Sequence, residues 1–291
     1  MSDVARKVLV TGGTSGLGLA MASALAAAGA AVVLTGRDGA RAAAVAAKLP
    51  GRARRPDGAE PGGGAGPAGG AGPAGGAEPG GGAEPGVVGI EMDVRDEVSV
   101  ARGVEQAWSR LGGIDMLVNN AGIGMRTVNP EFMTRSQAFW EVPVDGFRAV
   151  VETNLTGYFL VAREVTPRML ATGGGRIVNI SVNSSTMQRA GFVPYGPSRA
   201  GSEAMSRVMA ADLRDTGVTV NLLLPGGATV TGMVPPGTVT AGQRFLEPAV
   251  MGPPIVWLAS AEAAGVHDER IVAAEFDQWL SDRKTGVGGA R

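Results

Sequence analysis

Six short apolar runs alternate with helix-length segments along this chain, and this alternation constrains its fold more than any other feature. Five of the six runs end at glycine or serine, residues that often bound buried strands. Repeated strand–helix–strand units form a parallel sheet with helices on both faces. We therefore predict an α/β protein with a Rossmann-like doubly wound parallel sheet in a single domain of three α/β/α layers. The predicted strands are 7–12, 31–36, 87–94, 115–122, 175–181 and 218–226, and the predicted helices are 16–28, 41–49, 98–111, 144–170 and 195–215.

Residues 57–86 interrupt this pattern. All of them are Gly, Ala or Pro except Asp57, Glu60, Glu78 and Glu84. Such a tract has little to bury against the entropy of ordering it, so we predict a disordered loop between residues 1–56 and 87–291 of one domain. It is either a tolerated insertion or a docking segment, and nothing in its sequence favours docking.

Composition excludes several classes of function. Lys and Arg number 26 against 27 Asp and Glu, and no basic run suits nucleic acid. The chain has no cysteine, which excludes disulfides and thiolate chemistry. It has neither a signal-like apolar segment nor a membrane-length one, so we expect a cytoplasmic protein without membrane contact. Its only histidine, His267, is expected in a turn or at the surface, and no metal site is expected.

The motif TGGTSGLG follows the first predicted strand and opens the first predicted helix. Glycines there permit a tight turn and let backbone N–H groups face a pyrophosphate at the helix N-terminus. This position in a βαβ unit predicts dinucleotide binding rather than a purely structural turn. The predicted contacts are Thr11, Gly12, Thr14, Ser15, Gly16, Leu17 and Gly18.

The end of the second predicted strand favours NADP(H) over NAD(H). An acid is expected there for a 2′-hydroxyl, but the sequence LTGRD places Gly36 at that position and Arg37 beside it. An arginine without a carboxylate suits a 2′-phosphate, unless Arg37 is an ordinary surface residue. Asp38 is expected to be solvated or to cap the next helix.

These motifs, with DV at Asp93–Val94, NNAG at 119–122, NLTG at 154–157, GRIVNIS, YGPSR and PGG, resemble the short-chain dehydrogenase/reductase family. The resemblance covers nearly the whole chain outside the Gly/Ala/Pro tract. It implies that Asn154 holds a water in a proton relay and that Thr231 contacts the nicotinamide carboxamide. It also implies a small-molecule substrate and a homodimer or homotetramer. Further cofactor contacts that it implies are Asp93, Val94, Asn120, Ala121, Gly122, Pro225 and Gly226.

In that family a tyrosine transfers a proton, and a lysine four residues later favours its phenolate and binds the nicotinamide ribose. Here Tyr195 is followed four residues later by Arg199, on the same face of a helix. Arginine supplies positive charge and hydrogen bonds to the ribose. Because arginine does not readily deprotonate, a proton relay through this position would be weakened.

The family's substrate-polarising serine lies thirteen residues before the tyrosine, where this chain has Val182. Ser181 is the preferred hydroxyl candidate, and Asn183 is its rival. We expect an NADP(H)-dependent oxidoreductase that interconverts a carbonyl and a secondary alcohol. The alternatives are a non-redox enzyme catalysing elimination, isomerisation or cyclisation, and a catalytically silent nucleotide-binding protein.

Two segments are candidates for the substrate side. Residues 124–140 contain Met125, Phe132, Phe139 and Trp140, which either pack an apolar substrate or hold the loop to the body. Residues 231–245 resemble the family's substrate lid, and Met233 and Phe245 are candidate lining residues.

Overall fold

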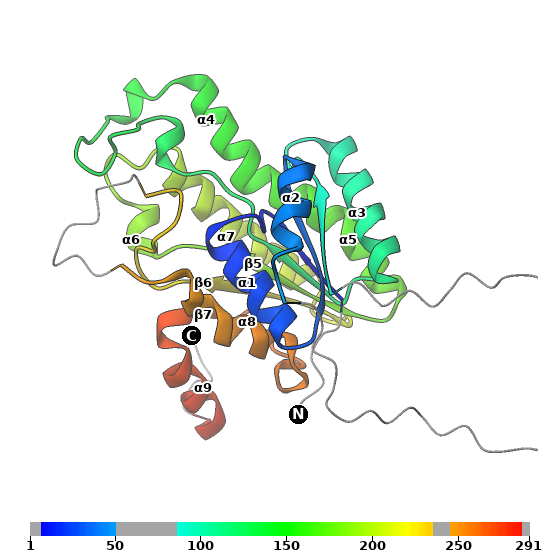
Figure 1. The fold of residues 1–291 in the computed structure, drawn as a ribbon. Helices are drawn as coiled ribbons and strands as arrows, with labels where there is room; N and C mark the ends of the chain where they lie inside the picture. The colour runs from blue at the N-terminus through cyan, green and yellow to red at the C-terminus, as the bar shows by residue number, and fades with distance from the viewer. Residues whose placement is uncertain (1–6, 51–85, 235–244, 287–291) are drawn as a thin grey trace, which may run out of the picture.

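The computed structural model describes residues 7–50, 86–234 and 245–286. In these ranges seven parallel strands form one sheet in the order β3-β2-β1-β4-β5-β6-β7, which confirms the predicted doubly wound fold (Figure 1). The predicted disordered tract, apart from Gly86, lies outside the described residues. The strands are β1 (Lys7–Val10), β2 (Ala31–Gly36), β3 (Val87–Glu91), β4 (Met116–Asn119), β5 (Gly175–Ile180), β6 (Val218–Leu224) and β7 (Arg270–Val272).

Helices cover both faces of this sheet, and each predicted helix is present with ends shifted by a few residues. Buried residues of α1 and α8 pack on one face, and those of α3, α5 and α7 pack on the other (Figure 1). The helices are α1 (Gly16–Ala27), α2 (Gly39–Ala46), α3 (Glu97–Leu111), α4 (Val144–Val151), α5 (Gly157–Ala171), α6 (Ser184–Met187), α7 (Tyr195–Asp212), α8 (Gly252–Ala259) and α9 (Phe276–Thr285).

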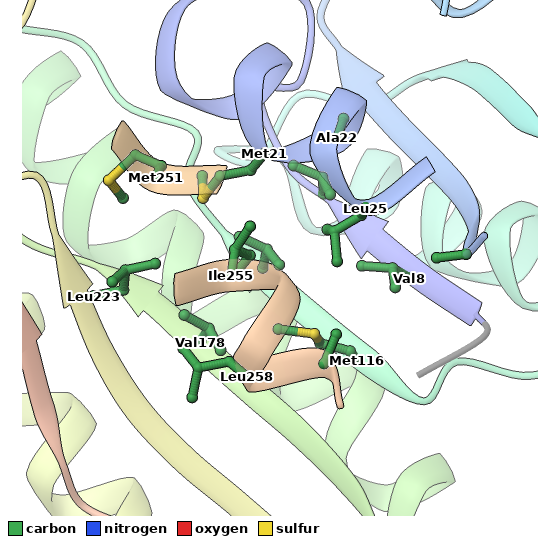
Figure 2. Close-up of a cluster of buried hydrophobic side chains, with 14 of the residues drawn as sticks. Val8, Met21, Ala22, Leu25, Met116, Val178, Leu223, Met251, Ile255 and Leu258 are labelled. Atoms are coloured by element: carbon green, nitrogen blue, oxygen red, sulfur yellow. The ribbon is translucent and has the colours of Figure 1, made fainter. Parts of the chain in front are cut away.

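Alternation along the strands builds two cores. Val8 and Val10 face the cluster that contains α1 and α8, whereas Leu9 between them faces the cluster of α3 and α5. Figure 2 shows the first cluster, in which Leu25 of α1 and Ile255 of α8 lie among the apolar side chains that cover this face of the sheet. The strands of such a sheet are apolar on both sides, which is why they read as continuous apolar runs in the sequence.

The predicted helix at 144–170 is a continuous helical segment with an irregular centre. A π-helical turn, Glu152–Thr156, joins α4 to α5. Strand β7 was not predicted, because its three residues are too few to show a strand pattern and follow a charged stretch. Within the described ranges, no helix is long and apolar enough to cross a membrane, and no cluster of three or more potential metal ligands occurs.

The topology determines where a ligand can bind. The first three strands lie in the order β3-β2-β1, and β4 lies on the other side of β1. At the ends of these two strands Val10 of β1 pairs with Val118 of β4. The chain continues from β1 into α1 on one face of the sheet and from β4 toward α5 on the other face. Ligands of open α/β sheets bind where the strand order switches in this way. The glycine loop follows β1 there, and the NNAG motif follows β4.

Candidate active site

A cleft of about 790 Å³ lies beyond the carboxyl ends of the strands. It brings the glycine loop together with Tyr195 and Arg199, which are far away in the sequence. Four of the predicted site residues, Thr11, Gly18, Asn154 and Gly226, do not line the cleft. The predicted residues that do line it are Gly12, Thr14, Ser15, Gly16, Leu17, Arg37, Asp93, Val94, Asn120, Ala121, Gly122, Ser181, Tyr195, Arg199, Pro225 and Thr231.

The glycine loop needs glycine for both conformation and space. Gly12 and Gly16 have φ angles of +63° and +55°, in the left-handed region that other residues rarely adopt. A Cβ atom on Gly12 would lie 2.7 Å from the Ala121 Cα atom. Ser15, the N-cap residue of α1, makes no side-chain capping hydrogen bond, and the first turn of α1 has no acidic residue. The N–H groups of that turn are thus available to an anion.

Thr11 and Asn120 connect the glycine loop to the loop after β4. The Thr11 hydroxyl accepts hydrogen bonds from the backbone N–H groups of Asn120 and Ala121, at 2.9 and 3.0 Å. The Asn120 side chain donates to the carbonyl oxygens of Thr11 and Gly12, at 2.9 and 3.1 Å. Thr11 does not line the cleft itself. Its hydroxyl instead joins the glycine loop to the loop after β4, and both loops form the wall of the cleft.

Several arginines line the end of the cleft that lies beside the carboxyl ends of β2 and β3, called the far end below. Arg37 is exposed and lines it, and Asp38 caps α2 by accepting from the Arg41 N–H at 2.9 Å, as the sequence suggested. Asp93 accepts from Arg95 Nε at 3.0 Å and Nη2 at 2.6 Å, and these side-chain hydrogen bonds lower the pKa of Asp93. Sequence reasoning missed Arg41 and Arg95. Within the described lining, Asp93 is the only carboxylate, against Arg37, Arg41, Arg95, Arg126, Arg189 and Arg199.

Asn154 lies in the π-helical turn and is fully buried. Its Oδ1 accepts from the Ile123 N–H at 2.9 Å, and its Nδ2 donates to the Ile123 carbonyl at 3.0 Å and to the Ser198 hydroxyl at 3.1 Å. These bonds fix the loop after β4 to the start of α7. The sequence-based interpretation assigned a relay water to Asn154, and the structure gives this side chain a set of protein partners.

Tyr195 and Arg199 lie on the first turns of α7. Tyr195 is half-buried, and the Arg199 guanidinium carbon lies 5.4 Å from its ring centre. Arg199 is only 3% exposed, and Gly122 packs directly against its Nη2 atom. Burial opposes its charge, but the neighbouring Tyr158 and Tyr195 outweigh this effect and raise the pKa of Arg199. Arg199 therefore stays positively charged.

The Ser181 hydroxyl is engaged on the side of α7. It donates to Glu203 Oε2 at 2.6 Å, and Arg270 donates from Nε to the other oxygen of this carboxylate at 2.7 Å. Asn183 is half-buried at the cleft and donates one hydrogen to the Gly226 carbonyl at 3.1 Å. An amide NH₂ group has two hydrogens, so Asn183 retains one for a ligand, whereas Ser181 has given up its only one.

Aromatic residues and methionine form the near end of the cleft. Phe132 packs edge-on against Phe192 at 5.9 Å, and Met125, Met233 and Phe245 also line this end. Phe139 and Trp140 are instead 67% and 74% exposed and do not line the cleft. Sequence reasoning missed Phe192, which lies just before the tyrosine motif. The predicted lid, residues 231–245, lies partly outside the described residues.

His267 has a structural environment away from the cleft. Its Nδ1 accepts from the Val220 N–H at 3.3 Å, so its Nε2 carries the hydrogen that points to the Ala210 carbonyl at 2.8 Å. The side chain is half-buried between β6 and α7 rather than free at the surface. It lies in the irregular segment between the turn at residues 264–265 and β7.

Comparisons by sequence and by structure lead to one family. The family model for short chain dehydrogenase matches residues 6–58 and 77–238. The 3-oxoacyl-[acyl-carrier-protein] reductase FabG of Aquifex aeolicus (strain VF5) is 33% identical over 218 residues, covering 75% of this chain and 72% of that protein. A dehydrogenase/reductase from Sinorhizobium meliloti 1021 has a TM-score of 0.70 at 27% identity, covering 93% of this chain and 94% of the other. A short chain dehydrogenase from Burkholderia cenocepacia J2315 in complex with NADP has a TM-score of 0.69 at 26% identity, covering 92% and 95%.

Proposed function

The chain belongs to the short-chain dehydrogenase family, and we propose that it is an NADP(H)-dependent oxidoreductase that interconverts a carbonyl group and a secondary alcohol. One observation carries this proposal: Tyr195 and Arg199 line the same cleft as the glycine loop. A hydride carrier and a proton donor must reach the same carbonyl group from different sides, and this cleft offers a place for both.

The residues at the far end of the cleft fit a phosphorylated dinucleotide. Gly12 and Gly16 adopt the left-handed φ angles that shape the tight turn, and the uncapped first turn of α1 offers N–H groups to the pyrophosphate. Arg37 and Arg41 supply positive charge at the end of β2, where Gly36 leaves no carboxylate to repel a 2′-phosphate. When bound, the nicotinamide supplies or accepts the hydride.

In this proposal Tyr195 moves the proton. Its phenol is half-buried in the cleft, and it donates a proton to the carbonyl oxygen in reduction or takes one from the alcohol in oxidation. Arg199 occupies the position of the family's lysine and holds a permanent positive charge beside the phenol. Because Arg199 does not give up its own proton, protons must reach Tyr195 by another route.

We propose Asn183 rather than Ser181 as the group that polarises the carbonyl. The hydrogen bond from Ser181 to Glu203 takes up the only hydroxyl proton, whereas Asn183 retains an amide hydrogen at the cleft. The pairing of Tyr195 with the charged Arg199 supports a second candidate function. A cleft with Tyr195 beside a fixed charge also suits proton transfer without hydride transfer, as in an elimination or isomerisation.

We also propose a homodimer or homotetramer. Phe147 of α4 and Phe159 of α5 are 40% and 45% exposed, and Val208 of α7 is 60% exposed. Apolar side chains on neighbouring helices support association with further copies. Light scattering of the purified protein measures this state directly.

The first test is a titration with NADPH and NADH, followed by nicotinamide fluorescence. We expect both to bind, with NADPH preferred, and binding of neither would refute the proposal. Tyr195→Phe should retain nucleotide binding and lose turnover of carbonyl substrates, because only the transferred proton is removed. Arg199→Lys should retain or raise turnover. Loss of turnover in Arg199→Lys would favour the second candidate function.

A further inference from the structure

Arg199 is a buried cation whose side-chain partners are tyrosine phenols rather than carboxylates. It is 3% exposed, and the groups that perturb its pKa within the described residues are two phenols and no carboxylate. A buried cation without a counterion depends on hydrogen bonds for its stability. Its Nε makes none within the described structure, whereas its Nη1 makes two, to Tyr158 and to the Ile180 carbonyl.

Tyr158 is the side chain that holds Nη1. It lies at the start of α5, 1% exposed, and its Oη accepts a hydrogen bond from Arg199 Nη1 at 2.8 Å. The same Oη donates to the Ile180 carbonyl at 3.2 Å, and Nη1 donates to that carbonyl at 3.1 Å. These three groups form a closed triangle at the end of β5.

The triangle orients Arg199 toward the cleft. The guanidinium carbon lies 5.5 Å from the Tyr158 ring centre and 5.4 Å from the Tyr195 ring centre, so the cation sits between the two tyrosines. With Nη1 engaged by Tyr158 and Ile180, Nη2 is directed to Gly122, which lines the cleft. Tyr158 itself does not line the cleft.

We propose that Tyr158 is a positioning residue, which fixes the guanidinium of Arg199 so that this cation serves both Tyr195 and the bound nucleotide. The proposal rests on the proposed function and adds to it a residue outside the cleft. Arginine has a long flexible side chain, and without the phenol oxygen only one carbonyl would hold its Nη1.

Burial supports this assignment of roles. Removal from water raises the pKa of Tyr158, although Arg199 partly opposes this effect. Tyr158 therefore remains a neutral phenol that can both accept from Arg199 and donate to Ile180. Its hydroxyl has no further proton to exchange with a substrate, so any influence on the reaction passes through Arg199.

The test is a double-mutant cycle of Tyr158→Phe and Arg199→Met, read by NADPH affinity and by Tm. Tyr158→Phe removes only Oη, and Arg199→Met removes every donor while keeping an unbranched stem. We expect Tyr158→Phe to weaken NADPH binding on the order of fivefold when Arg199 is present, and to change it by less than about twofold in the Arg199→Met background.

A purely structural role for Tyr158 predicts a different outcome. In that case Tyr158→Phe lowers Tm but leaves NADPH affinity unchanged, or weakens it equally in both backgrounds, and either result overturns the proposal. Ser206→Ala is the matched control, because it removes another buried hydroxyl of the α7 region and should not change NADPH affinity.

The cycle also separates this inference from the proposed function. If the unaltered protein binds neither NADPH nor NADH, the proposed function fails, and the pair is then judged by Tm alone. Losses of stability that are less than additive would still support positioning of Arg199 by Tyr158. Additive losses would overturn it, because independent residues contribute independently.

Discussion

Replacing Asn154 with alanine separates a structural role of this residue from a role in proton transfer. The substitution removes three hydrogen bonds, two to the Ile123 backbone and one to the Ser198 hydroxyl. Each bond contributes about 0.5–1.5 kcal/mol to the free energy of unfolding. Because Asn154 is fully buried but Ile123 is only half-buried, water can satisfy part of what is lost. We expect a loss of about 3 kcal/mol.

Differential scanning calorimetry is a suitable assay. For a domain of this size, 1 kcal/mol shifts Tm by roughly 2–4 °C, so Asn154→Ala should lower Tm by about 6–12 °C. Asn183→Ala is the matched control, because it deletes the same amide from a half-buried position with one hydrogen bond and should cost less than about 1 kcal/mol. Adding Ser198→Ala to Asn154→Ala should cost less than the two losses summed, because the two side chains share a bond.

One result would refute this reasoning. If Asn154→Ala lowers Tm no more than Asn183→Ala does and yet abolishes turnover, Asn154 acts in proton transfer, and its backbone contacts are incidental. If Tm falls as expected and turnover falls only in proportion to the folded fraction, its role is to hold the loop after β4.

Three further outcomes follow from the geometry of the cleft. Arg37→Ala should weaken NADPH binding about tenfold and leave NADH binding within about twofold, because one charge-assisted hydrogen bond is worth at least about 1.4 kcal/mol. Equal weakening of both nucleotides in parallel titrations would remove Arg37 as the 2′-phosphate contact. Ser181→Ala should reduce kcat less than Asn183→Ala does, and the reverse ranking would make Ser181 the polarising group. Arg95 lowers the pKa of Asp93, so the charged form of Asp93 stabilises the folded state above its unfolded pKa of 3.8, and this contribution is lost as the pH falls through the still lower folded pKa. Asp93→Asn should therefore lower Tm near neutral pH but progressively less in acid, and a pH-independent difference in Tm would contradict this.

Local motifs of the sequence predicted the fold well, and most residues of the glycine loop and of the DV and NNAG motifs line one cleft. Each of the six predicted strands is an apolar run whose pattern is complete within a few residues, and the glycine loop follows β1 directly. By contrast, β7 has only three residues, and its place is decided by pairing with β6. The sequence also does not predict the π-helical turn, because its Asn154 bonds to segments far away in the sequence, the loop after β4 and α7.

Contacts between distant segments in the sequence determine how the candidate site residues are oriented. Ser181 has the right chemistry for a polarising hydroxyl, but this hydroxyl donates its hydrogen bond to Glu203, 22 residues later. Arg199 was interpreted through its charge and its spacing from Tyr195, and charge alone does not fix where a guanidinium points. Its direction comes from Tyr158, 41 residues earlier, and from the missing side chain of Gly122. The arginine at this position is thus held by an acceptor on α5 and lies in the space that Gly122 leaves after β4, so its effect on the reaction depends on residues outside the tyrosine motif.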